Sequence, residues 1–235
     1  MRKRSLLYLS LVLIGLLTFY AAGARSDSSE KNTAEVERVL NAVDVYKELI
    51  EIPEKGIPEA LLHKSQAIAI IPGYTKAAYV VGGEHGKGVL LVRRESGTWS
   101  IPVFISMTGG SVGFQIGFQK ADIILVFKDR RSVDTIAEGK FTLGGDASIA
   151  VGPVGRAAEA STDIKFEAEV YSYSKAKGLF AGVSITGASL SIDKEADERF
   201  YRKANLTADQ ILYKTDFEAP TSAQELKDII VRYAK

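Results

Sequence analysis

Ser111 is the residue whose surroundings first suggest catalysis, because the run Gly109–Gly113 (GGSVG) matches the G-x-S-x-G pattern of serine hydrolases. That chemistry needs a sharp strand-to-helix turn, and a histidine base that follows the acid along the chain. Both histidines, His63 and His85, precede Ser111. The residues after Gly113 alternate between apolar and small or polar types, as in a strand. We therefore interpret the run as a β-turn and predict that the protein is not an enzyme.

A second glycine run, Gly82–Gly88 (GGEHGKG), looks like a phosphate-binding loop at first sight. The Walker pattern and the dinucleotide fingerprint both fail, because Val81 and Leu91 stand where these motifs need a glycine or another small residue. We predict a hairpin turn that joins two strands, at 77–81 and 89–93. Consecutive glycine N–H groups beside Lys87 can also form an anion-binding nest, so ligand contact stays open as the alternative.

Metal and cofactor chemistry finds little support in the residue types. The chain has no cysteine, which excludes thiol catalysis, cysteine-ligated metals and disulfides. Its two histidines are far apart, without the spacing of a zinc site. We predict no cofactor and no metal site, although aspartate and glutamate oxygens leave a calcium ion open.

Six basic residues are candidates for contact with an anionic ligand. They belong to a strand-turn-strand unit and to the start of a predicted helix: Lys76, Lys87, Arg93, Arg94, Arg130 and Arg131. Cations at a helix N-terminus are unfavourable for the helix dipole unless an anion joins them, which singles out Arg130 and Arg131. Solvated strand edges are the alternative interpretation of these charges.

Helical periodicity predicts the elements that flank these residues. A helix over 33–51 has an acidic face opposite an apolar face, the latter made of Val36, Val39, Leu40, Val43 and Ile50. Asn32 is its expected cap, with Glu35 at the third helical position. Further helices are expected at 58–63, 131–138 and 194–204 and from Thr221 onward, where Thr221 and Gln224 suggest a capping box.

The stretch from Gln66 to Ile192 reads as strands separated by glycine. Of the 21 glycines, 18 lie between Gly73 and Gly187, which favours turns, bulges and curved sheet. Alternation at 112–119 and 164–171 predicts strands with one wet face, whereas 68–71 and 123–127 are apolar throughout and should be covered on both faces. The expected fold is α+β: a single domain with a curved, glycine-rich, mainly antiparallel β-sheet core flanked by N- and C-terminal helices.

The first residues are typical of an exported protein. Basic Arg2–Arg4, the apolar stretch Leu6–Phe19 and the small residues Ala22–Ala24 predict a signal peptide over 1–24, cleaved after Ala24. An uncleaved membrane anchor is the alternative. The remaining segments are expected to be a linker (25–32), an N-terminal helical segment (33–65), a β-rich core (66–205) and a C-terminal helical segment (206–235).

Charge excludes one class of partner. Removal of Arg2, Lys3 and Arg4 from the 30 basic residues leaves 27, against 29 acidic residues, so the mature chain is slightly acidic. Bulk attraction to nucleic acid or to an anionic membrane is therefore not expected, and any anion binding must come from a local basic patch. Hydrophobic residues at 46% and charged residues at 25% are typical of a globular domain.

Four separated strings resemble the SYLF domain family, in the right order between about Gln66 and Tyr201. They are 82–90, 109–117, 144–156 with Glu159-Ala160, and 171–174 followed by 178–184. The resemblance implies binding of anionic phospholipid, with phosphoinositides as ligands in eukaryotic members and actin association in some fungal ones, and it implies no catalytic residue. Bacterial members resemble exported envelope proteins, which implies a place in the periplasm or cell envelope.

Two features depart from the family pattern. Ala24 stands where a lipoprotein would carry its cysteine, and the leading helix, basic in eukaryotic members that use it on membranes, is acidic here. Phosphoinositide and actin are therefore doubtful as ligands of this chain. Our functional hypothesis is non-catalytic binding of phospholipid or a membrane surface through the six cations. A structural role, or binding of a protein partner with incidental lipid contact, is the alternative.

Overall fold

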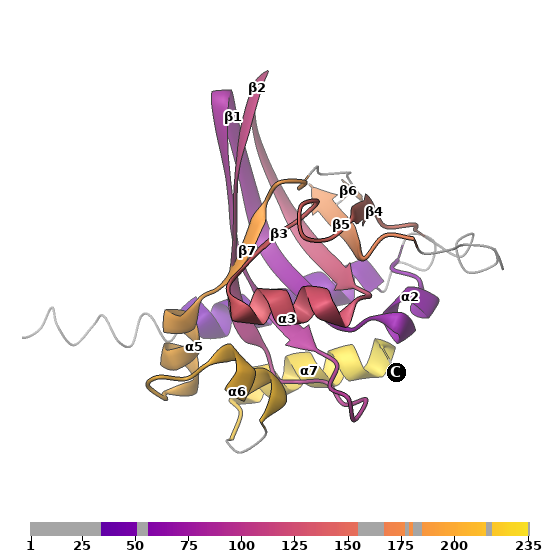
Figure 1. Cartoon of the computed structure of the whole chain (residues 1–235), viewed down its shortest axis with the longest axis vertical. Coiled ribbons are helices and arrows are strands. Elements are labelled where there is room, and N and C mark those ends of the chain that lie inside the picture. Colours follow the sequence, from indigo (N-terminus) through magenta and orange to yellow (C-terminus); the bar gives the residue numbers. More distant parts are fainter. Residues whose placement is uncertain are drawn as a thin grey trace, which may run out of the picture.

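The computed structural model describes residues 34–50, 56–154, 167–176, 179–180, 185–214 and 218–234. Of residues 78–81, 111–117, 140, 179 and 180 it describes the backbone alone. Helices pack around the lower part of a sheet, and one end of its two longest strands projects beyond the rest (Figure 1).

The two longest strands, β1 (Ala67–Val92) and β2 (Val103–Phe127), pair antiparallel along nearly their whole length. Ala67 faces Phe127 at one end of the register, and Leu90 faces Val103 at the other. Their sequences are rich in valine, isoleucine and aromatic residues, which favour extended backbone and pack well on a pleated surface. We call this pair the ribbon.

The ribbon doubles back on itself. In a straight strand Lys76 and Glu84 would be about 26 Å apart, yet Lys76 Nζ lies 3.2 Å from Glu84 Oε2. At the other end of β1 the N–H of Arg93 donates to the carbonyl of Gln66 at 2.8 Å. The reversal therefore falls between Lys76 and Glu84, where the register with β2 shifts between Ala78 and Val80. This reversal forms the projecting end in Figure 1.

The prediction of turns at the two glycine runs is wrong. Gly82–Gly88 is strand, paired with Ile105–Ser111, and Gly109–Gly113 belongs to β2. Close approach explains the glycines better: a Cβ on Gly88 would lie 2.9 Å from Ile71 Cα, and one on Gly86 would lie 2.9 Å from the ring of Tyr74. The two limbs of β1 can pack this tightly only where no side chain intervenes.

Shorter strands complete a seven-stranded sheet. They are β3 (Lys140–Thr142), β4 (Ile149–Val151), β5 (Val170–Ala176), β6 (Leu179–Phe180) and β7 (Ser189–Ile192). β5 and β7 pair antiparallel with different parts of β2, and the β4–β5 pair is parallel. The mainly antiparallel α+β sheet is thus confirmed. Of the strand expected at 164–171, residues 164–166 lie outside the described part, and β5 begins at Val170.

Helices cover both faces of the sheet. They are the helix at 34–50, α2 (Glu59–Lys64), α3 (Arg130–Glu138), α5 (Lys194–Tyr201), α6 (Ala208–Tyr213) and α7 (Thr221–Tyr233). One core cluster joins helix 34–50, α2 and α7 to Ile68, Ile70 and Ile124. A second joins α3 and α6 to the opposite side chains, among them Ala69 and Ile123. The prediction that these apolar strands are covered on both faces is confirmed.

Several helix details differ from expectation. Val36 and Leu40 are 38% and 41% exposed, whereas Glu35 is buried because it pairs with Arg199 at 2.9 Å. Pro220, not Thr221, occupies the N-cap of α7, without a side-chain cap. Helix α6 was not predicted, although Thr207 and Gln210 form its capping box. The predicted cap Asn32 lies outside the described residues.

Candidate functional site

Arg93 and Arg94 both donate to backbone carbonyls of neighbouring elements. Arg93 donates to the carbonyls of Ser65 (3.0 Å), Leu62 (3.3 Å) and Ala234, and its guanidinium lies 5.0 Å from the centre of the Trp99 ring. Arg94 donates to the carbonyl of Leu212 at 2.7 Å. Burial lowers the pKa of both guanidinium groups. Both side chains are therefore committed to neutral carbonyls of the surrounding chain.

Arg130 has a similar structural role at the start of α3. It donates to the carbonyl of Arg93 at 2.8 Å and lies 5.1 Å from the centre of the Tyr213 ring. The anion expected at this helix N-terminus is Asp129, the N-cap, which accepts from the N–H of Arg131 at 3.0 Å. The protein itself thus supplies the negative charge that the dipole favours.

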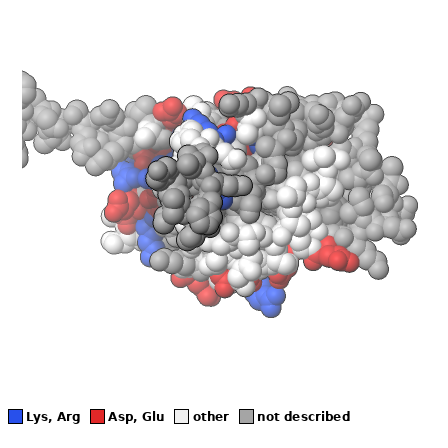
Figure 2. All heavy atoms as spheres, turned by 90° about the horizontal axis from the view of Figure 1, so that it is seen from above, with Lys and Arg blue, Asp and Glu red and all other residues white. Residues whose placement is uncertain are grey.

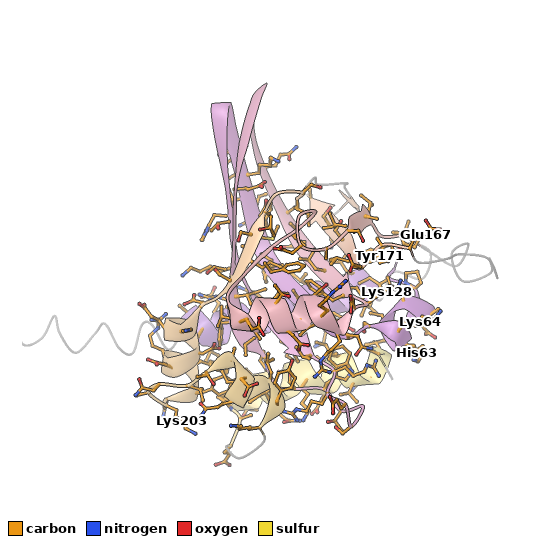
Figure 3. All side chains as sticks on the ribbon, in the orientation of Figure 1. His63, Lys64, Lys128, Glu167, Tyr171 and Lys203 are labelled. Carbon is orange, nitrogen blue, oxygen red and sulfur yellow. The ribbon has the colours of Figure 1, made fainter. Side chains whose placement is uncertain are left out.

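Arg131 is exposed, and it lies between two carboxylates. Its Nη2 is 3.4 Å from Asp129 and 3.2 Å from Glu169. Hydrogen bonds from Ser148, followed by those from Arg131, lower the pKa of Glu169. Lys128, a basic neighbour, lies 5.9 Å from the ring of Tyr171 (Figure 3). The surface beside α3 is consequently mixed in charge.

The remaining two candidates lie on the ribbon. Lys76 pairs with the buried carboxylate of Glu84, and burial, followed by the neighbouring Glu84 side chain, raises the pKa of Tyr74 well above its ordinary value. Lys87 is half exposed, 3.6 Å from Asp193 Oδ2. Lys76 lies beside Glu84 across the reversal of β1. Arg93 is nine positions beyond Glu84, which is about 30 Å of extended chain. The structure therefore does not gather the six cations into one patch.

A different cluster surrounds Lys87, where β1, helix 34–50 and the start of α5 meet. Asp193 Oδ2 lies 3.5 Å from Arg38 and 3.6 Å from Lys87, and Asp193 also caps α5 through the N–H of Ala196. Arg38 is largely buried, with its guanidinium 5.2 Å from the centre of the Phe104 ring. Arg38 was not predicted as a site residue, because its helical position placed it on the polar face.

Asp197 lies beneath this cluster. Its side chain is buried, and one carboxylate oxygen accepts from the N–H of Phe104 at 2.8 Å. Burial raises the pKa of this carboxyl from 3.8 to about 8. Asp193 is the carboxylate that both Arg38 and Lys87 contact, whereas Asp197 accepts from the backbone.

A hollow of about 390 Å³ opens beside these groups. Its lining combines helix 34–50 with both limbs of β1: Ala34, Glu37, Arg38, Asn41, Pro72, Gly73, Thr75, His85, Gly86 and Lys87. We call it the Arg38–Lys87 hollow. Pro72 and Gly73 separate it from a second hollow that is lined by Lys120 and three carboxylates, Asp44, Glu48 and Asp122. The Arg38–Lys87 hollow is the better place for an anion, because Glu37 is the one acidic residue in its lining.

The hollow at Arg94 and Arg130 is less suited to anions. It is larger, about 540 Å³, but its lining includes Glu95, Asp134 and Asp209. Both arginines already donate to backbone carbonyls. An anion there would face three carboxylates and two committed guanidinium groups.

The described residues give no support to catalysis or metal binding. Ser111 lies within β2 opposite Gly82, so the strand-to-helix turn of a nucleophile elbow is absent there. In the described ranges, no group of three or more His, Asp and Glu side chains could hold a metal ion. No helix in the same ranges is long and apolar enough to span a bilayer.

Comparison with known proteins gives the family. Residues 108–233 match the family described as "Ysc84: Las17-binding protein actin regulator". SH3 domain-containing YSC84-like protein 1 is 37% identical in Xenopus laevis (195 residues, 80% of this chain and 58% of that protein) and 35% identical in Homo sapiens (195 residues, 80% and 56%). LAS seventeen-binding protein 3 of Saccharomyces cerevisiae is 39% identical over 162 residues, 68% of this chain and 35% of that protein.

This chain spans just over half the length of the vertebrate relatives and about a third of the yeast protein. The matched region nevertheless covers most of the described fold, from β2 to α7 for the family and beyond it for the relatives. The chain belongs to the Ysc84 family, the SYLF-domain family that its glycine strings resemble.

Proposed function

We propose that the protein binds anionic phospholipid at a membrane surface, without catalysis, and that the Arg38–Lys87 hollow receives the headgroup phosphate. The carrying observation is the pair of cations, Arg38 and Lys87, that share the single carboxylate of Asp193 beside an open hollow. Lys87 Nζ lies 3.6 Å from Asp193 Oδ2, which is long for a charge-assisted hydrogen bond. A phosphate oxygen that approaches Lys87 more closely can therefore replace this contact. His85 adds ring nitrogens to the same lining.

The cellular setting is part of the proposal. We propose that the chain is exported to the periplasm or cell envelope after cleavage behind Ala24, as its first residues predict. Phosphatidylglycerol-type lipids then suit the proposal better than phosphoinositides, because the leading helix is acidic on its exposed face.

Vesicle flotation of residues 25–235 tests the headgroup site. We expect Lys87→Glu to weaken binding to anionic vesicles by more than tenfold, since each cation near the surface contributes about 1 kcal/mol and the reversal also adds repulsion. Lys203→Glu is the matched control, because Lys203 is exposed and lies at the corner between α5 and α6 (Figure 3). Equal losses in both variants would mean that net charge alone matters.

Partner binding is the second candidate function. It is favoured by the description of the matched family, which names Las17 binding and actin regulation. The two functions separate in the flotation experiment: a folded wild-type domain that ignores anionic vesicles would favour a protein partner over lipid.

A further inference from the structure

The projecting end of the ribbon has an uncharged sequence. No charged residue occurs in 77–83 or in 107–119, the segments that flank the reversal of β1 and of β2. Both segments run together beyond the helices in Figure 1. Their sequences include Tyr79, Phe114 and Phe118. A long uncharged projection is unusual for a surface that faces water alone.

Phe118 gives the clearest side-chain evidence. It is 70% exposed, more than any other large hydrophobic residue in the described part of the chain, and it faces the exposed Ala77 across the ribbon. A single exposed phenyl ring needs no explanation. Here, however, the exposed ring lies where the uncharged segments begin.

Cations lie at the base of this projection. Thr75 pairs with Lys120, and Lys76 pairs with Gln119, so the two lysines occupy neighbouring rungs of the ribbon. Figure 2, which looks at the molecule from the projecting end, shows basic and acidic side chains interspersed around the rim. Lys120 is exposed, and it lines the hollow next to the Arg38–Lys87 hollow. An anionic surface that receives the tip would therefore meet these cations at its edge.

The dimensions of the ribbon match a lipid interface. Tyr79 lies three positions after Lys76, which is about 10 Å of extended chain, and apolar elements at interfaces insert about 5–10 Å. Thr75 and His85 lie one or two rungs below Lys76 and line the Arg38–Lys87 hollow. A tip inserted to this depth would hold the hollow at the level of the headgroups.

We propose that the end of the ribbon inserts into the outer hydrocarbon of an anionic bilayer while Lys120 and the Arg38–Lys87 hollow contact the headgroups. This inference rests on the proposed lipid-binding function and adds the element that penetrates. A membrane is a better occupant than a groove in another protein, because the tip projects beyond the helices, carries no charged residue in 77–83 or 107–119, and has two lysines on neighbouring rungs at its base.

A single-cysteine label tests insertion directly, because the natural chain has no cysteine. Residues 25–235 with Phe118→Cys are labelled with an environment-sensitive fluorophore and mixed with vesicles of phosphatidylcholine and phosphatidylglycerol (3:1). We expect a blue shift and quenching by bilayer-embedded quenchers. Val151→Cys on β4 is the matched control: Val151 is 67% exposed and should report water in both states.

Binding of unlabelled variants completes the test. Phe118→Asp should weaken vesicle binding at least tenfold, whereas Val151→Asp should leave it unchanged. Insertion would be overturned if the wild-type domain binds vesicles, the label at position 118 stays in water and Phe118→Asp binds as well as the wild type. The headgroup site would then still stand. Absence of wild-type binding would overturn both proposals. A blue shift without vesicles that grows with protein concentration would identify a second copy as the occupant and reject the membrane.

Discussion

At the scale of single residues, the basic side chains divide by what they contact, not by where they lie in the sequence. Arg93, Arg94 and Arg130 were predicted as lipid contacts, yet each donates to a backbone carbonyl. Guanidinium groups have five donors and can satisfy several buried carbonyls at once. Sequence alone cannot distinguish this use from anion binding, because both need the same residue type near a strand end.

Arg93 should therefore matter for stability. Arg93→Ala removes hydrogen bonds from a charged donor to three carbonyls, together with its contact to Trp99. We expect the free energy of unfolding to fall by about 2–4 kcal/mol, since hydrogen bonds to charged groups contribute about 1.5–3 kcal/mol each but are not additive. Chemical denaturation measures the change. Arg131→Ala, which removes an exposed ion pair, should cost no more than about 1 kcal/mol; equal losses would contradict the assignment.

Asp197 predicts a pH dependence of stability. Its pKa is raised by burial from 3.8 to about 8, so the folded protein keeps a proton that the unfolded chain releases. The stabilising contribution is present at low pH and is lost as pH rises through about 4 to 8. Asp197→Asn retains an acceptor for the N–H of Phe104 and has no proton to lose.

Denaturation midpoints at pH 5 and pH 8 test this sign. We expect the wild-type protein to lose a few kcal/mol more than Asp197→Asn over this interval, since one unit of pKa corresponds to about 1.4 kcal/mol. Parallel pH profiles would show that Asp197 is ionised in the folded state.

At the scale of elements, the sequence supports the strands and most helices but not the path of the ribbon. Periodicity located the helix at 34–50, α3 and α7 to within a few residues, because each has a clear apolar face. The glycine runs were misread as turns, since turn glycines and close-packing glycines have the same local signature. The partner of Gly88 is Ile71, 17 positions earlier, and no local pattern reveals that contact.

Two glycines on the same strand make this distinction measurable. Gly88→Ala would place a Cβ against the backbone of Ile70 and Ile71, whereas a Cβ on Gly83 would have no atom within 4 Å. We expect Gly88→Ala to lower the free energy of unfolding by at least 3 kcal/mol, because backbone must move, and Gly83→Ala to change it by less than about 1 kcal/mol. Similar stabilities would show that the two limbs of β1 are not packed as described.

At the scale of the whole molecule, the candidate site depends on contacts that the sequence separates. The Arg38–Lys87 hollow joins helix 34–50 to both limbs of β1, and Asp193 reaches it from the start of α5. Lys87 was predicted from its glycine neighbours, but Arg38 and His85 become relevant only when the ribbon folds back. Overall charge gives a complementary constraint: with 30 basic and 29 acidic residues, long-range attraction to an anionic surface is weak.

This near-neutral charge predicts a small effect of salt on vesicle binding. If apolar insertion and a few positioned cations dominate, raising sodium chloride from 0.1 M to 0.5 M should weaken binding only several-fold, because screening acts on two or three contacts. Flotation at both salt concentrations measures the change. A loss of a hundredfold or more would indicate diffuse electrostatic adsorption and would argue against the ribbon as the main contact.

The last prediction for the whole chain concerns its export and processing. The basic residues Arg2–Arg4, the apolar stretch and Ala22–Ala24 predict cleavage after Ala24, which removes three positive charges and leaves 27 basic residues against 29 acidic ones. The exported protein should then begin at Arg25, and intact-mass measurement of the periplasmic fraction reads this directly. Ala24→Asp should block processing, because the peptidase requires a small residue there, and should leave the protein attached to the membrane by its apolar segment. Detection of residues 1–24 on exported wild-type protein would instead establish an anchor, and membrane contact by the ribbon would then occur beside a tether that already holds the domain at the bilayer.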